Sequence, residues 1–221
     1  MTRLIEYLSN NTKLSSFLVF TYFLLVVLPH EQVGLLVVWI FKSATRVTYQ
    51  TTIASFGILL LFAFLFFVYK GYRGQKYKFI LPGYLTITIF LMLVSFHMLI
   101  IHNIEIIHFA QYAGMAILLF PLVKTISGTI FWSTILGTID EAYQYFYLSP
   151  ERTDYFDFND IILNLLGAAI GLSIIISHAK KLNTPIPKKW YKSPIILTII
   201  GIMVSTSLLL KTSILQVYPG L

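Results

Sequence analysis

The sequence predicts an all-α protein, a polytopic transmembrane helical bundle of about six to seven spans. The first observation behind this prediction is that 57% of the 221 residues are hydrophobic. The second is that only 11% are charged, against about 25% in a typical soluble domain. The third is that apolar runs of bilayer length recur along the chain, with a mean hydropathy of +0.79. No long polar segment separates them, so we expect a single integral membrane domain over residues 1–221.

The apolar runs place the expected spans in chain order. Six runs lie at 14–39, 51–69, 79–101, 104–123, 128–147 and 160–178, and a seventh lies at 194–210. The first run contains the polar stretch PHEQ at 29–32. We therefore favour a span that ends near Leu28 and is followed by an interfacial helix at 33–41. His30 and Glu31 are interpreted as a kink or a re-entrant feature, because nothing in the sequence ties them to other polar residues.

Two basic loops predict the topology. They are KGYRGQKYK at 70–78 and KKLNTPIPKKWYK at 180–192, and short loops rich in Lys and Arg stay in the cytoplasm. Four expected spans separate the two loops, and an even number places both loops on the same side. The N-terminus and Lys124 are then inside, while the segments around His102 and at 148–159 are outside.

Charge and cysteine content exclude several functions. The formal net charge is +7, but the basic residues form short clusters between apolar runs and have no aromatic stacking platform beside them, so we expect no nucleic-acid partner. The chain contains no cysteine, which rules out disulfides, thiolate metal ligands and a cysteine nucleophile.

The acidic residues are concentrated in one part of the chain. Seven of the nine fall between Glu105 and Asp160. Under the predicted topology, Glu105 and His108 open a span that enters from outside, and Tyr112 follows His108 on the same helix face at i+4. Charged groups within bilayer-length segments are costly, so their default interpretation is functional.

Two further spans bring polar residues to the same depth. Asp140, Glu141 and Gln144 lie in a span that leaves at the outer surface, within roughly 10 Å of it. Asp160 opens the next span from outside, and Asn164 follows at i+4. Gly167 and Gly171 continue this face at i+7 and i+11, where another helix can approach closely.

The shared depth predicts one outer-leaflet site. Asp140 and Glu141 would be paired by Arg152 from the outer loop, paired by His108, or neutralised by a bound cation. A structural alternative remains open, because intramembrane carboxylates and amides can serve only to hold helices together. In that interpretation Asp160, with Asn159, could be a simple helix N-cap.

Four motifs resemble the VanZ-like family of small bacterial membrane proteins, named for a member associated with resistance to the glycopeptide teicoplanin. The motifs are EIIHFAQY at 105–112, DEAYQYF at 140–146, SPER at 149–152 and NDIILNLLGAAIG at 159–171, within a VanZ-like core at about 79–178. The family commonly has Asp followed by Lys before the His segment, whereas this chain has Glu105 followed by Ile106. The resemblance implies a multi-pass protein of the bacterial cytoplasmic membrane with an envelope role, and it supplies no reaction.

We expect the outer-leaflet pocket to bind or act on an amphiphilic envelope molecule, such as a lipid-linked cell-wall precursor or a lipoglycopeptide. In an enzymatic version, His108 and either Asp140 or Glu141 would act as general base and acid, and Arg152 would hold a phosphate or carboxylate. The expected substrate-contacting residues are Glu105, Tyr112, Gln144, Arg152 and Asn164.

A cation offers another use for the same carboxylates. Asp140, Glu141 and Asp160 could hold a divalent ion such as Mg²⁺, because hard cations prefer oxygen ligands. The alternative function is a proton- or ion-coupled transporter or binding protein without catalysis, and an enzyme-free scaffold is a third. The substrate and the oligomeric state stay open.

Overall fold

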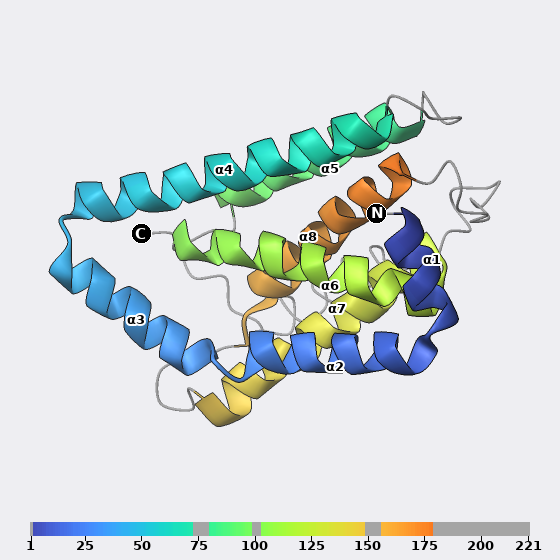
Figure 1. Cartoon of the computed structure of the whole chain (residues 1–221). Helices are drawn as coiled ribbons and strands as arrows, with labels where there is room; N and C mark the ends of the chain where they lie inside the picture. The colour runs from blue at the N-terminus through green and yellow to red at the C-terminus, as the bar shows by residue number, and fades with distance from the viewer. Residues whose placement is uncertain (1, 73–79, 99–102, 149–155, 179–221) are drawn as a thin grey trace, which may run out of the picture.

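The computed structural model describes residues 2–72, 80–98, 103–148 and 156–178, and this part of the chain is all-α, as predicted (Figure 1). A 3-10 turn, η1 (Asn103–Ile106), precedes α6, and a π-helical turn, η2 (Gln144–Leu148), follows α7. The eight α-helices are α1 (Thr2–Asn10), α2 (Thr12–Val27), α3 (His30–Ser43), α4 (Arg46–Tyr72), α5 (Ile80–Met98), α6 (Ile107–Val123), α7 (Ile126–Tyr143) and α8 (Phe158–Ser177).

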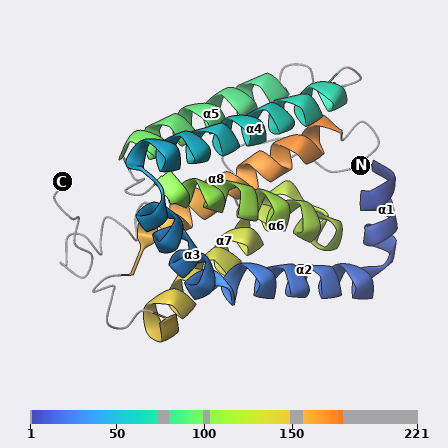
Figure 2. The same cartoon turned by 60° about the vertical axis from the view of Figure 1, so that its left-hand side comes forward.

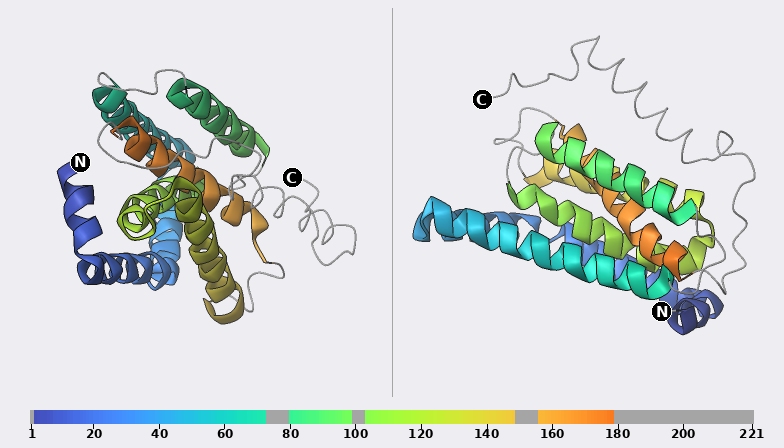
Figure 3. Two further views of the ribbon diagram at one scale, coloured as in Figure 1. Left: turned by 90° about the vertical axis from the view of Figure 1, so that its right-hand side faces the viewer. Right: turned by 90° about the horizontal axis from the view of Figure 1, so that it is seen from above.

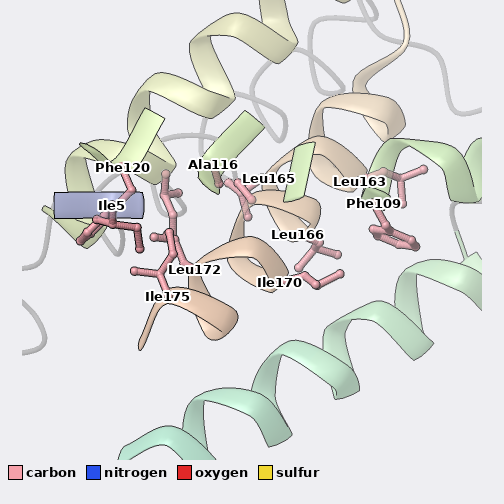
Figure 4. Close-up of a cluster of buried hydrophobic side chains, with 12 residues drawn as sticks. Ile5, Phe109, Ala116, Phe120, Leu163, Leu165, Leu166, Ile170, Leu172 and Ile175 are labelled. Atoms are coloured by element: carbon pink, nitrogen blue, oxygen red, sulfur yellow. The ribbon is translucent and has the colours of Figure 1, made fainter. Parts of the chain in front are cut away.

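Helix α8 is the centre of the bundle. It packs against α6 and α7 on one side and against α4 and α5 on the other (Figure 3). Its apolar side chains form most of the main core cluster, together with residues of α6 and with Ile5 of α1 (Figure 4). Phe109 and Leu163 lie near one end of this cluster, and Ile5, Phe120 and Ile175 lie near the other. A single helix therefore ties both ends of the core together.

Two glycines allow α8 to approach α6 closely. A Cβ atom on Gly167 would lie 2.8 Å from the carbonyl oxygen of Phe109 and 2.9 Å from that of His108. A Cβ atom on Gly171 would collide with the backbone of Ala113. Neither position has room for a side chain unless a backbone moves. The predicted small-residue face of α8 is thus confirmed, and it packs on the first half of α6.

Helix α7 approaches α8 through a third glycine. A Cβ atom on Gly137 would lie 3.0 Å from both Cβ and Nδ2 of Asn164. The helices that carry His108, Asp140 and Asp160 therefore pack together, as the shared depth of their polar residues predicted. Thr125 begins α7 by accepting a hydrogen bond from the backbone N–H of Gly128 at 3.2 Å.

Among the described residues, length and composition identify two helices able to cross a membrane, at Val47–Gly71 and Phe158–Ser177. The pair formed by α2 and α3 is a third if the two count as one bent span. In the first helix, 6% of the most apolar 18-residue stretch is buried inside the bundle. In the second helix the buried share is 78%. An exposed apolar surface as large as that of α4 needs a lipid or protein partner, and these helices indicate a membrane protein.

Three other expected spans contain helices, but these helices are not among those long and apolar enough to cross a membrane. The runs at 79–101, 104–123 and 128–147 contain α5, α6 and α7, of which α6 and the stretch Leu85–Val94 are shorter apolar helices. The run at 194–210 lies outside the described residues.

The first apolar run is divided in two, as expected. Helix α2 ends at Val27, α3 begins at His30, and their axes differ by 42° (Figure 2). Pro29 precedes the new helix, where its missing N–H costs nothing. The second piece begins earlier and is longer than the 33–41 expected from the sequence. Helix α1 was not predicted at all.

The two ends of the bundle differ in the chain segments that meet there. Gly71, near the end of α4, lies against Ser177 at the end of α8, since a Cβ atom on Gly71 would be 2.7 Å from the Ser177 carbonyl carbon. The helix ends that precede the two basic loops therefore lie at the same end of the bundle, and the loops from residue 73 and from residue 179 lie outside the described residues. Ile5 packs at this end as well, so α1 lies there too.

Cysteine labelling tests which end faces the cytoplasm, because the native chain has no cysteine. Tyr147, 76% exposed at the far end of η2, and Lys124, exposed after α6, lie at opposite ends of α7. We expect an impermeant maleimide to label Tyr147→Cys in intact cells, and to label Lys124→Cys only after the membrane is opened. The reverse pattern would contradict the predicted orientation and place the site described below on the cytoplasmic side.

Candidate functional site

Three helix ends bring a histidine and three carboxylates together. His108 lies in the first turn of α6, Asp140 and Glu141 lie in the last turn of α7, and Asp160 lies in the first turn of α8. All four are buried, with exposed fractions of 4%, 0%, 3% and 9% in that order. They occupy the end of the bundle opposite the one at which α8 ends.

The His108 ring is held between two residues one turn apart on α8. Its Nδ1 lies 2.9 Å from Oδ1 of Asn164, and its Nε2 lies 3.4 Å from Oδ2 of Asp160. With the Asn164 oxygen toward the ring, the Asn164 amide nitrogen faces α7. Since an amide oxygen can only accept, Nδ1 carries the hydrogen, and in the neutral ring Nε2 presents its lone pair to Asp160.

Asp140 is held in a second set of hydrogen bonds beside the first. The Tyr112 hydroxyl donates to Oδ2 at 3.1 Å, and Gln144 Nε2 donates to Oδ1 at 3.3 Å. Tyr112 itself is fully buried. Both oxygens of Asp140 are therefore occupied by donors from α6 and η2.

Glu141 connects the two sets. Gln144 Nε2 donates to its Oε1 at 3.3 Å. One ligand atom each from His108, Glu141 and Asp160 lies within 4.8 Å of the others. The structure thus groups Glu141 with His108 and Asp160, whereas the cation set expected from the sequence was Asp140, Glu141 and Asp160.

The helix cap of α8 is Asp157. Its side chain accepts a hydrogen bond from the backbone N–H of Asn159 at 2.9 Å. Burial raises the pKa of this carboxyl above that of an ordinary aspartate. Asp160 is therefore not the N-cap, and that structural interpretation of Asp160 is wrong: its side chain turns to His108.

Glu105, in η1, is close enough to Asp160 for their charges to interact. Arg152, expected to pair with Asp140 or Glu141, lies outside the described residues. Within the described part of the chain, His108 is the basic side chain that lies near Asp160, and no Lys or Arg pairs with the buried carboxylates.

The structure adds His30, which the sequence did not connect to the site. The break between α2 and α3 brings the His30 ring to 6.4 Å from the His108 ring, between centroids. Its charge also interacts with Asp140. The available signal was an ionisable residue beside a proline within an apolar run, but nothing local showed which helix it would meet.

The fold and the site are those of an all-α protein with two or three helices apolar and long enough to cross a membrane, and with a buried histidine–carboxylate cluster at one end of the bundle. Comparison with family models, with curated proteins and with solved structures finds no match to this chain. The chemistry therefore has to be argued from the cluster. Its groups can exchange a proton, or bind a cation through one nitrogen and several oxygens.

Proposed function

We propose that this protein is a multi-pass protein of the bacterial cytoplasmic membrane, with about six to seven spans, that binds or acts on the polar end of an amphiphilic envelope molecule. One observation carries the proposal: Asp140, Glu141 and Asp160 are buried together with His108 at one end of the bundle. Burying ionisable groups without Lys or Arg partners costs several kcal/mol, roughly, per ion. Such a cost favours a function over packing.

The position of the cluster suits a ligand with a tail. The exposed apolar side chains of α4, such as Phe62 and Phe66, could contact the tail of such a molecule. Its polar headgroup would then lie at the end of the bundle that holds the cluster. The resemblance to VanZ-like proteins supports an envelope molecule, either a lipid-linked precursor or a lipoglycopeptide, and a contribution to glycopeptide tolerance. Arg152 stays a predicted contact for an anionic headgroup.

Proton transfer is the chemistry that the cluster supports in an enzyme. Nδ1 of His108 is fixed by Asn164, so Nε2 is the atom able to take a proton. Glu141 is the carboxyl on the facing helix with one oxygen outside the hydrogen bonds described above. His108 would act as base and Glu141 as acid, with Asp140 holding Gln144 and Tyr112 in place.

Native nanodiscs test the proposal. We expect wild-type protein, extracted with its surrounding membrane, to retain an envelope amphiphile that mass spectrometry detects at about one per chain. Glu141→Gln keeps the side-chain shape and should lose most of it. Glu6→Gln makes the same change at an exposed residue of α1 and should lose none. Equal amphiphile content in all three proteins would contradict the proposal.

The break between α2 and α3 favours a second candidate, a proton- or ion-coupled carrier. Interrupted helices form ion sites at the bilayer midplane in many transporters, and here the interruption places His30 beside the cluster. Proton or cation flux into liposomes that needs both Glu141 and His30, with no retained amphiphile, would favour this candidate over the first.

A further inference from the structure

We propose that His108, Glu141 and Asp160 form a binding site for one divalent transition-metal ion, such as Zn²⁺ or Mn²⁺. The inference deepens the proposed function and rests on it in one respect, namely that the ion would receive an anionic oxygen of the amphiphile. The ion takes the place of proton transfer between His108 and Glu141, because a metal-bound Nε2 has no lone pair to accept a proton. With three protein ligands, an ion of this kind keeps a further position for water or for a ligand atom.

The separation of two of the ligand atoms suits a shared ion better than a hydrogen bond. The 3.4 Å between His108 Nε2 and Asp160 Oδ2 exceeds the usual N–H···O range of about 2.7–3.2 Å. Two atoms that each bind Zn²⁺ at about 2.0–2.2 Å in tetrahedral geometry lie roughly 3.4 Å apart. One ligand atom each from His108, Glu141 and Asp160 lies within 4.8 Å of the others, so small side-chain rotations would bring Glu141 to the same ion.

The orientation of His108 is already that of a metal ligand. Metal-binding histidines nearly always donate their other ring N–H to an oxygen, which fixes the ring and its tautomer. Here Asn164 Oδ1 accepts from Nδ1 at 2.9 Å and directs the Nε2 lone pair at Asp160. Two acceptors facing each other in a buried place need a proton or a metal ion between them, and their 3.4 Å separation suits the metal ion.

Two further features of the cluster support a bound cation. Asp160 Oδ1 is buried and has no hydrogen-bond partner in the described part of the chain, although buried polar atoms are nearly always paired. Glu141 and Asp160 carry two formal negative charges, which one divalent ion would balance. Asp140 differs, because both of its oxygens already accept hydrogen bonds.

The ligand chemistry selects the metal. One imidazole nitrogen with two carboxylates suits Zn²⁺, Mn²⁺ or Fe²⁺, whereas Mg²⁺ prefers oxygen alone and keeps most of its water. The structure therefore replaces the magnesium set expected from the sequence with one in which His108 takes the place of Asp140.

Metal binding to the purified, tag-free chain in nanodiscs tests the site. After chelator treatment, we expect Zn²⁺ to bind at about one per chain by elemental analysis, and Co²⁺ to give d–d absorption bands that Zn²⁺ removes. His108→Gln, Glu141→Gln and Asp160→Asn should each weaken binding more than about 100-fold, and Asn164→Ala, which only positions His108, about 10–100-fold. Glu6→Gln should bind as the wild type does.

Asp140→Asn separates the two ligand sets. It should keep the Co²⁺ bands, because Asp140 is not a ligand in the proposed site. Loss of the bands in Asp140→Asn with retention in His108→Gln would overturn the proposal, as would about one ion per chain in both His108→Gln and Asp160→Asn. Each variant is checked by its gel-filtration profile and by its unfolding midpoint, which Zn²⁺ should raise in the wild type and leave unchanged in the three ligand variants.

The amphiphile and metal measurements fail independently. If wild-type protein retains an amphiphile in a Glu141-dependent way but binds no Zn²⁺, Mn²⁺ or Co²⁺, the metal site is overturned and the proposed function stands. If the metal binds with the expected ligand dependence and no amphiphile is retained, the metal site stands and the proposed function fails.

Discussion

Gly171→Leu is expected to prevent folding of the bundle. A Cβ atom at this position collides with the Ala113 backbone of α6, so neither a rotamer change nor a side-chain shift can make room. Overpacking by a few methylene groups costs about 1–3 kcal/mol where side chains can move. With a backbone in the way the cost is larger, and it falls on the central helix pair of the fold. We expect little protein at the membrane and an aggregated gel-filtration profile.

Gly34→Leu is the matched control. Gly34 is also within a helix, α3, but nothing lies within 4 Å of a Cβ atom placed there. The same substitution should leave accumulation unchanged or raise stability by up to about 1 kcal/mol, the helix-propensity gain over glycine. Gly171→Leu protein that elutes like the wild type would show that α6 and α8 do not pack as closely as described.

Glu141→Gln is expected to abolish function in cells without loss of folded protein. The amide keeps the shape of the side chain, and its oxygen can still accept from Gln144, so a purely structural role would survive. It loses the charge and the acid–base capacity. We expect the envelope phenotype, measured as glycopeptide susceptibility, to revert to that of a deletion strain at equal protein level.

Tyr112→Phe shows how much function is lost when the cluster loses a hydrogen bond but no charge. It removes the hydroxyl that donates to Asp140 and leaves every charge in place. Loss of one such hydrogen bond costs about 1 kcal/mol, so the phenotype should weaken only slightly. Full function in Glu141→Gln cells, or equal loss in both variants, would favour a structural role for the cluster over proton transfer and cation binding.

The sequence predicted the helical class, the close face of α8 and the grouping of three helix ends, because these follow from composition, small-residue spacing and a consistent span count. The spacing of Gly167 and Gly171 is enough to predict a close helix contact. The pairing of individual side chains cannot be predicted from local spacing. Whether His108 meets Asp160 or Asp140 depends on the rotation of α6 about its axis, which no local pattern encodes.

Two other features were missed for related reasons. Helix α1 is too short to resemble a span, and its place in the core depends on Ile5 reaching Phe120 and Ile175. His30 joins the cluster only because α2 and α3 are bent at Pro29. The cap considered from the sequence was Asp160, whereas the path of the backbone before α8 makes Asp157 the cap.

The central position of α8 has a consequence for how the protein is made. It follows the other described helices in the chain, so it is made after them, yet α4, α5, α6 and α7 all pack against it. Until it is inserted, His108 on α6 lacks both of its partners on α8, Asn164 and Asp160, and the faces of α6 and α7 that α8 covers stay open. The arrival of α8 therefore completes the core and buries the histidine–carboxylate cluster in the same step.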